Sequence, residues 1–194
     1  MTSDEVLNLI NQGESETLEF KLRLPDTLLL AKQISAFANT QGGVLIFGVG
    51  DDGKIAGIDN LKLTYQVLEQ AEKRITPAIK LKPDTISLNG KKVVIVKIEK
   101  GNLSPYFAGK QAFQRKNMDI IPLTGDNLYK DIQGRATTTD EIMKEVKRLT
   151  AVFEQLNNEV LTSKNWRSKI ADWVLGGIIG ALISLALAMF LGQN

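Results

Sequence analysis

The sequence of 194 residues contains neither cysteine nor histidine. Their absence excludes disulfides, thiol nucleophiles, zinc sites built on these two residue types and every histidine-based catalytic triad. The remaining candidate metal ligands are carboxylates and carbonyl oxygens, which suit Mg²⁺, Mn²⁺ or Ca²⁺. A metal site in this chain would therefore be built around aspartate and glutamate side chains.

Acidic residues are scarce in the middle of the chain. Residues 73–116 carry 11 basic and 2 acidic side chains, whereas residues 1–72 carry 5 basic and 11 acidic ones. This division suggests a polyanionic partner bound beside an acidic site. The alternative is a fold that mixes both sets over one surface. The basic set is Lys73, Arg74, Lys80, Lys82, Lys91, Lys92, Lys97, Lys100, Lys110, Arg115 and Lys116.

The run from Val44 to Val49 is apolar, of strand length and rich in β-branched and aromatic residues. Such a run is typical of a central strand that is buried on both faces. Gly42 and Gly43 permit a sharp turn before it. Asp51 and Asp52 lie in a Gly-Asp-Asp-Gly turn after it, which predicts a hairpin with a short strand over residues 54–58. The two carboxylates at this sheet edge belong either to a site or to an ordinary turn.

The stretch from Glu14 to Leu24 alternates between apolar and charged residues, which predicts a half-buried strand. Glu19 and Lys21 point the same way on such a strand. Together they could hold a metal ion and a phosphate, or they could form a solvated outer face.

The remaining patterns predict helices and hairpins interleaved up to about residue 124, a mixed α/β (α+β) fold. Ser3 is expected to cap the first helix and Asp26 the second. The strongest hairpin signal is Asn89-Gly90, and a further hairpin is expected around Gly109. The expected helices are residues 4–12, 27–38 and 61–75, and the two strands flanking Asn89-Gly90 are residues 85–88 and 92–98.

The C-terminal third predicts a different organisation, with a linker over residues 125–137 and a helix over residues 138–163. Apolar residues in this helix follow a heptad spacing, which we call the seam. It predicts either a coiled coil or an amphipathic helix packed on its own domain. The seam consists of Ile142, Val146, Leu149, Phe153, Leu156 and Val160.

A transmembrane helix is expected over residues 170–191, because Trp173 to Leu191 is 19 residues without a charge. Basic residues precede it, so we expect a single-pass, tail-anchored membrane protein whose N-terminal domain faces the cytoplasm. Small residues recur every four positions in this span and favour close helix approach. With the seam, they predict a parallel homo-oligomer. The small residues are Gly176, Gly180, Ser184 and Ala188.

With these features in place, residues 13–124 resemble the Schlafen AlbA-type domain. Three segments carry the resemblance in this order: residues 13–21 (GESETLEFK), 35–43 (SAFANTQGG) and 47–57 (FGVGDDGKIAG). The resemblance implies nucleic-acid binding. It does not extend to the predicted seam helix or the predicted span.

Some Schlafen members are metal-dependent RNA-cutting enzymes with a three-carboxylate site. The resemblance places Glu14, Glu19 and Asp51 at those positions, with Asp52 competing for the third. Lys21 matches the adjoining basic position. These enzymes build a clamp from a duplicated unit, and because this chain shows no internal repeat, a clamp would need a second copy.

A later strand of the family commonly reads Tyr-x-Arg-x-Gly-Ser. Here Arg115 is kept, whereas Asn117 and Met118 replace the Gly-Ser turn.

We therefore expect a membrane-anchored protein that binds RNA or DNA mainly through phosphate contacts. The alternative is an endonuclease that uses Mg²⁺ or Mn²⁺ held by Glu14, Glu19 and Asp51, with Lys21 offsetting phosphate charge. The residues expected to contact nucleic acid are Lys73, Arg74, Lys91, Lys92, Lys110, Arg115 and Lys116.

Overall fold

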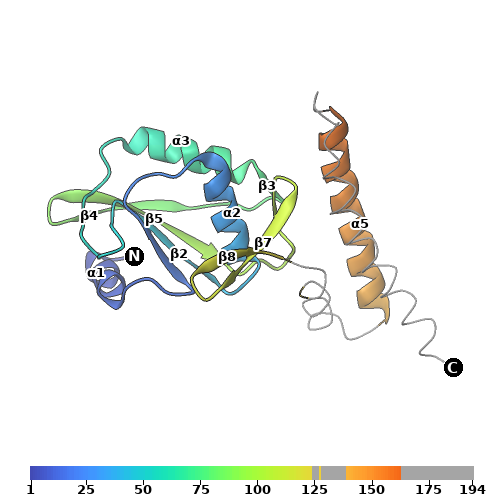
Figure 1. Cartoon of the computed structure of the whole chain (residues 1–194), viewed down its shortest axis with the longest axis horizontal. Coiled ribbons are helices and arrows are strands. Elements are labelled where there is room, and N and C mark those ends of the chain that lie inside the picture. Colours follow the sequence, from blue (N-terminus) through green and yellow to red (C-terminus); the bar gives the residue numbers. More distant parts are fainter. Residues whose placement is uncertain (124–126, 128–138, 163–194) are drawn as a thin grey trace. The chain divides into compact units, whose positions relative to one another are not determined.

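The computed structural model describes residues 1–123, residue 127 and residues 139–162 (Figure 1). The chain divides into two compact units, Met1–Pro122 and Leu123–Asn194. Both units are described separately below.

The first unit is built on a four-stranded mixed sheet whose strand order is β1-β2-β5-β4. β1 (Leu18–Lys21) runs parallel to β2 (Gly42–Phe47), which pairs antiparallel with β5 (Lys91–Glu99). β4 (Pro83–Leu88) closes the other edge, antiparallel to β5. The predicted central strand is therefore confirmed, although it begins at Gly42 and ends at Phe47.

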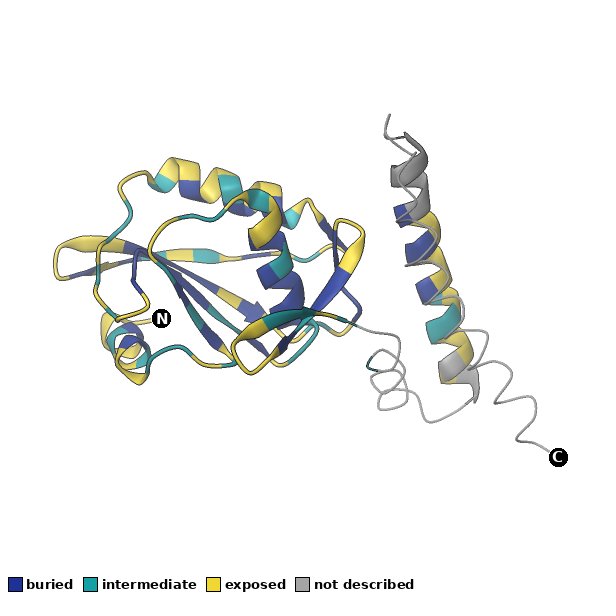
Figure 2. Cartoon of the chain, viewed as in Figure 1, coloured by how far each residue is buried: buried dark blue, intermediate teal, exposed yellow. Residues whose placement is uncertain are grey.

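Two hydrophobic cores cover the two faces of this sheet. The core on one face contains residues of α1 (Ser3–Gln12), and the core on the other contains residues of α2 (Thr27–Ala38). Ile46 points into the α1-side core, whereas Leu45 and Phe47 point into the α2-side core, and all three are fully buried. β2 is thus buried on both faces, as its continuous apolar sequence predicted. In Figure 2, buried residues follow the strands and α2.

A second, smaller antiparallel sheet packs beside α2, in the strand order β3-β6-β7-β8. Its strands are β3 (Ile75–Thr76), β6 (Phe107–Ala108), β7 (Gln111–Lys116) and β8 (Asp119–Pro122). The hairpin around Gly109 was predicted, whereas β3 and β8 were not. α2 lies between the two sheets and also contacts α3 (Leu61–Glu72), so all its residues from Gln33 to Ala38 are buried.

Two of the expected turns and caps are confirmed at the level of the backbone. Asn89 and Gly90 have positive φ angles of 50° and 76°, as a tight two-residue hairpin turn requires. Asp26 caps α2 by accepting hydrogen bonds from the backbone N–H groups of Leu28 and Leu29.

Four local predictions were wrong. Thr2, not Ser3, caps α1, because Thr2 and Glu5 form a reciprocal capping box. β1 ends at Lys21, where its partner β2 also ends, so Leu22 is 49% exposed. The third helix ends at Glu72, because Ile75 pairs in β3 instead. Residues 54–58 form no strand, since only one bridge joins Val49 to Ile55.

The described part of the second unit is dominated by one long helix, α5 (Thr139–Thr162). Leu149, Phe153 and Leu156 of the seam are buried. No helix among the residues that the structure describes is long and apolar enough to cross a membrane. The predicted span, most of the linker and the side chains of Ile142 and Val160 lie outside the described residues.

Candidate functional site

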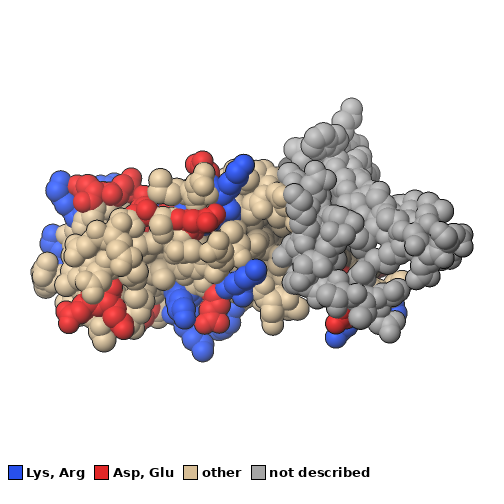
Figure 3. Space-filling view, turned by 90° about the horizontal axis from the view of Figure 1, so that it is seen from below, with Lys and Arg blue, Asp and Glu red and all other residues tan. Residues whose placement is uncertain are grey.

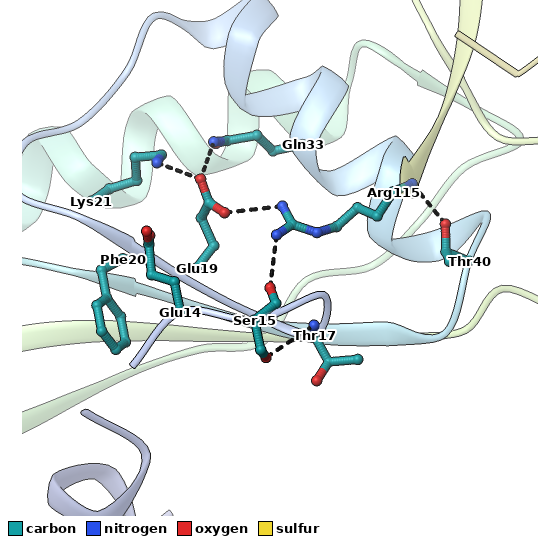
Figure 4. Close-up of polar contacts among 9 residues, drawn as sticks. All are labelled: Glu14, Ser15, Thr17, Glu19, Phe20, Lys21, Gln33, Thr40 and Arg115. Carbon is teal, nitrogen blue, oxygen red and sulfur yellow. Dashed lines mark hydrogen bonds and ion pairs between the residues drawn. The ribbon is translucent and has the colours of Figure 1, made fainter. Parts of the chain in front are cut away.

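β1, α2 and β7 bring together four polar residues (Figure 4). They are Glu19 and Lys21 of the motif segment 13–21, Gln33 and Arg115. Leu18 and Phe20 point into the α1-side core. Because side chains alternate along a strand, Glu19 and Lys21 point to the opposite face, toward α2. The alternating pattern thus positions Glu19 where Gln33 of α2 and Arg115 of β7 reach it.

The Glu19 carboxylate accepts hydrogen bonds from three side chains. Its Oε2 accepts from Nη1 of Arg115 at 3.0 Å, and its Oε1 accepts from Nζ of Lys21 and, at 3.5 Å, from Nε2 of Gln33. The Glu19 side chain is only 12% exposed. Charge-assisted bonds of this kind are stronger than neutral ones, so the carboxylate is fixed in place by two cations.

Arg115 is completely buried and bonded within the fold. Its Nη2 donates to the carbonyl oxygen of Ser15 at 2.9 Å, and its backbone N–H donates to Oγ1 of Thr40 at 2.9 Å. Its guanidinium lies over the ring of Phe37, 4.5 Å from the centroid, which is within cation–π range. Arg115 therefore does not belong to the exposed basic surface, although its charge placed it in the predicted contact set.

Two buried polar atoms in this cluster have no hydrogen-bond partner among the described residues, Nε of Arg115 and Oε1 of Gln33. The cluster is otherwise well bonded, so its main physical role in the structure is to join β1 to the second sheet.

Glu14 and Asp51 lie in different environments from Glu19. Oε1 of Glu14 accepts from the backbone N–H of Phe20 at 2.8 Å, so it satisfies a donor on the free edge of β1. Asp51 is exposed in the turn after Val49. Asp52 beside it pairs with Lys54 at 2.6 Å, and the hydrogen bonds from Lys54 lower the pKa of Asp52.

Within the described part of the chain, no group of three or more acidic side chains could hold a metal ion. Glu14, Glu19 and Asp51 are therefore not gathered as a metal site in this structure. Glu19 is already neutralised by Lys21 and Arg115, which compete with a cation for its oxygens.

The segment that ends α2 has a structural role that its sequence did not reveal. The Asn39 amide donates to the carbonyl oxygens of Tyr106 and Phe113, both at 2.8 Å, and its Oδ1 accepts from the Tyr106 N–H at 2.7 Å. Asn39 thereby fastens the second sheet to the end of α2.

The turn after Arg115 keeps the backbone shape that a glycine would provide. Asn117 has a φ angle of 58°, in the left-handed region where asparagine is tolerated best after glycine. Asn117 therefore adopts a conformation that is also open to glycine.

The predicted nucleic-acid contacts do not form one patch. Lys91 and Lys92 begin β5 at the β4–β5 turn, whereas Arg74 and Lys110 lie near β3 and β6, at the opposite end of the first unit (Figure 1). The Arg74 carbonyl accepts a hydrogen bond from the Gly109 N–H, which places these two basic residues together. Lys73 is paired with Glu69 at 2.7 Å, and this partner lowers the pKa of Glu69.

Basic and acidic side chains are mixed on the surface. Figure 3 shows several separate basic clusters on one face, with acidic side chains beside them. A hollow of about 640 Å³ gathers four other members of the basic set. Its charged lining residues are Lys80, Lys82, Asp84, Lys97, Glu99 and Lys100. These four lysines were not among the predicted contacts, although the spacing of Lys80 and Lys82 indicated one shared side of an extended segment.

The fold and the site define a two-sheet α+β domain whose motif residues are tied together across α2. A comparison with known families matches residues 14–124 to the family described as Schlafen, AlbA_2. The chain therefore belongs to the Schlafen AlbA_2 family, and the resemblance based on the three motif segments is confirmed.

Two solved structures match this chain at low sequence identity, and the first of them, with a TM-score above 0.5, has a similar fold. The DIP2311 protein from Corynebacterium diphtheriae matches with a TM-score of 0.53 and 17% identity, over 70% of this chain and 32% of that chain. The N-terminal domain of a RecG-related protein from Nitrosomonas europaea matches with a TM-score of 0.44 and 16% identity, over 55% of this chain and 80% of that one. This chain thus covers about a third of the first structure. A comparison with curated proteins gave no match.

Proposed function

We propose that this chain binds RNA or DNA, mainly through contacts to phosphates. Membership of the Schlafen AlbA_2 family supports this proposal, because the family is associated with nucleic-acid binding. The observation that carries it is exposure: of the 11 basic residues in the 73–116 set, all except Arg115 are exposed to solvent. Surface lysines and arginines of this kind neutralise phosphates with little reading of sequence.

The proposal predicts binding that weakens steeply as salt rises. Each phosphate contact to a single strand contributes a slope of about −0.7 to a plot of log affinity against log salt. Fluorescence anisotropy of the full chain with labelled RNA and DNA measures this slope. A salt range of about 50 to 300 mM is wide enough to show the steep dependence that several phosphate contacts produce. An affinity that is independent of salt, or no binding at all, would contradict the proposal.

The metal-dependent endonuclease stays a second candidate. It is favoured by one observation: Glu14 bonds the backbone of Phe20, the residue next to Glu19, so two of the three carboxylates implied by the resemblance lie at β1. The test is cleavage of end-labelled RNA or DNA by the full chain with Mg²⁺ or Mn²⁺. A chain that binds these substrates but yields no metal-dependent product contradicts this candidate.

We also propose that the chain is attached to a membrane by residues 170–191 and pairs in parallel with a second copy. The support is sequence pattern alone: a charge-free run of 19 residues, its basic flank and the seam before it. Pairing would place two domains side by side and could replace a clamp built within one chain.

A further inference from the structure

The C-terminal end of β5 carries exposed charges, whereas the middle of the strand, residues 93–96, is buried. Val93 and Ile95 point into the α1-side core. Because side chains alternate, Lys97 and Glu99 point to that same face, and both are exposed. The face covered by α1 therefore continues as an open, charged surface at this end of the sheet.

The 640 Å³ hollow lies at this end and is positively charged. Four of its lining side chains are lysines and two are carboxylates. Lys80 lies 3.0 Å from Glu72 and Lys97 lies 3.5 Å from Glu99. Lys82 and Lys100 form no ion pair within the part of the chain that the structure describes, so their ammonium groups are available to an anion.

A second hollow, of about 420 Å³, lies across the same strand end. Lys97 and Lys100 border both hollows. Besides Lys97, Glu99 and Lys100, the second hollow has polar side chains that are uncharged and exposed, and their hydroxyl and amide groups can donate to or accept from a sugar or a base. They belong to Gln12, Ser15, Thr17 and Gln41.

Gly42 allows this strand end to approach β2 closely. A Cβ atom at Gly42 would lie 2.6 Å from the carbonyl oxygen of Ile98 and 2.7 Å from the backbone nitrogen of Lys100. The backbone that carries Lys100 is therefore held against Gly42 at the start of β2. This contact makes the border shared by the two hollows a rigid part of the fold.

We propose that a single nucleic-acid strand crosses the end of β5, with Lys82, Lys97 and Lys100 on its phosphates and the hydroxyl and amide side chains of the second hollow beside its sugars and bases. This inference rests on the proposed function and assigns the nucleic-acid contacts to one site, the end of β5. The volumes suit a strand and not a duplex, because hollows of roughly 300–1,000 Å³ enclose only small organic groups such as one or two nucleotides. A positively charged groove that follows the phosphate backbone is typical of single-strand sites.

The test compares two double variants of the full chain, Lys82→Ala with Lys100→Ala and Lys54→Ala with Lys62→Ala. All four lysines are exposed, and each pair removes the same charge. Loss of two single-strand contacts is expected to make the salt slope less steep by about 1.4 and to weaken binding about 25-fold at 0.1 M salt. The control pair lies outside the basic 73–116 set and is expected to bind like the wild type.

Acetylation footprinting of the wild type gives a second measurement that needs no variant. Bound single-stranded RNA or DNA is expected to protect Lys82, Lys97 and Lys100, but not Lys54 or Lys62. Equal losses of affinity in both double variants, or protection of the control lysines alone, would overturn this binding site. Either result would leave the proposed function intact. A wild type that binds no nucleic acid would overturn both.

Discussion

At the scale of single residues, the family resemblance and the structure assign two different roles to Glu19. The family resemblance makes it a metal ligand, whereas the structure makes it the partner of a buried arginine. The Glu19–Arg115 pair spans β1 and β7, and the Arg115 side chain has no exposure to solvent. Removing one member of a buried pair leaves the other charge uncompensated, which is the expensive part of such an interaction.

Glu19→Gln is accordingly expected to lower the free energy of unfolding by about 3 kcal/mol, because it leaves the Arg115 guanidinium without its counter-ion. Glu14→Gln is the matched control: its amide oxygen can still accept from the Phe20 N–H, so the expected loss is below about 1 kcal/mol. Urea denaturation followed by circular dichroism measures both values.

The same two variants bear on catalysis. If Glu19 were catalytic and had no structural role, Glu19→Gln would abolish metal-dependent cutting and leave the unfolding midpoint unchanged. That outcome would contradict the structural role argued here.

At the scale of elements, the contact between β2 and β5 depends on a glycine. Gly42 and Gly90 have nearly the same φ angles, 77° and 76°. They differ in surroundings, because a Cβ at Gly90 would meet nothing within 4 Å, whereas one at Gly42 would collide with the backbone of β5 and the residue after it. Comparing the two positions separates backbone strain from close approach.

Gly90→Ala is expected to lower the free energy of unfolding by about 1 to 2 kcal/mol, because a residue with a Cβ is strained in the left-handed conformation. Gly42→Ala is expected to cost at least about 2 kcal/mol more, since paired backbone must move as well. Thermal and urea unfolding of the two variants measure the difference. Equal losses in the free energy of unfolding at the two positions would show that the close approach at Gly42 adds nothing to the effect of the substitution.

At the scale of the whole molecule, the two alternatives for α5 differ in what its seam contacts. Leu149, Phe153 and Leu156 are buried, and packing within one chain requires the seam to contact that chain's own residues. A parallel coiled coil instead requires the seam to face a second copy. A shared membrane would raise the effective concentration of that copy, so even a short seam could pair.

The oligomer proposal predicts that Leu149→Lys with Leu156→Lys abolishes crosslinking between copies in membranes, because two ammonium groups would enter the seam. Thr150→Lys with Gln155→Lys adds the same charge at exposed positions outside the seam and is expected to crosslink like the wild type. A wild type that remains monomeric, or a seam variant that crosslinks as well as the control, would refute parallel pairing.

Local sequence determined the elements whose signals lie within a few residues. The β2 strand, the Asp26 cap and the Asn89-Gly90 hairpin were all predicted, because burial pattern, capping and turn geometry depend on neighbours in the chain. The motif segments likewise identified the family. Membrane attachment and pairing stay predictions, since the residues that carry them lie mostly outside the described part of the chain.

Only the tertiary structure decided which charges are buried and which meet at a surface. In the sequence Arg115 is one basic residue among eleven, and its burial depends on Ser15, which is 100 residues away. The short strands β3 and β8 exist only because distant partners complete their hydrogen bonds. The lysine-lined hollow combines residues 80–84 with residues 97–100 through the pairing of β4 and β5. Such juxtapositions follow from long-range packing, which no local pattern encodes.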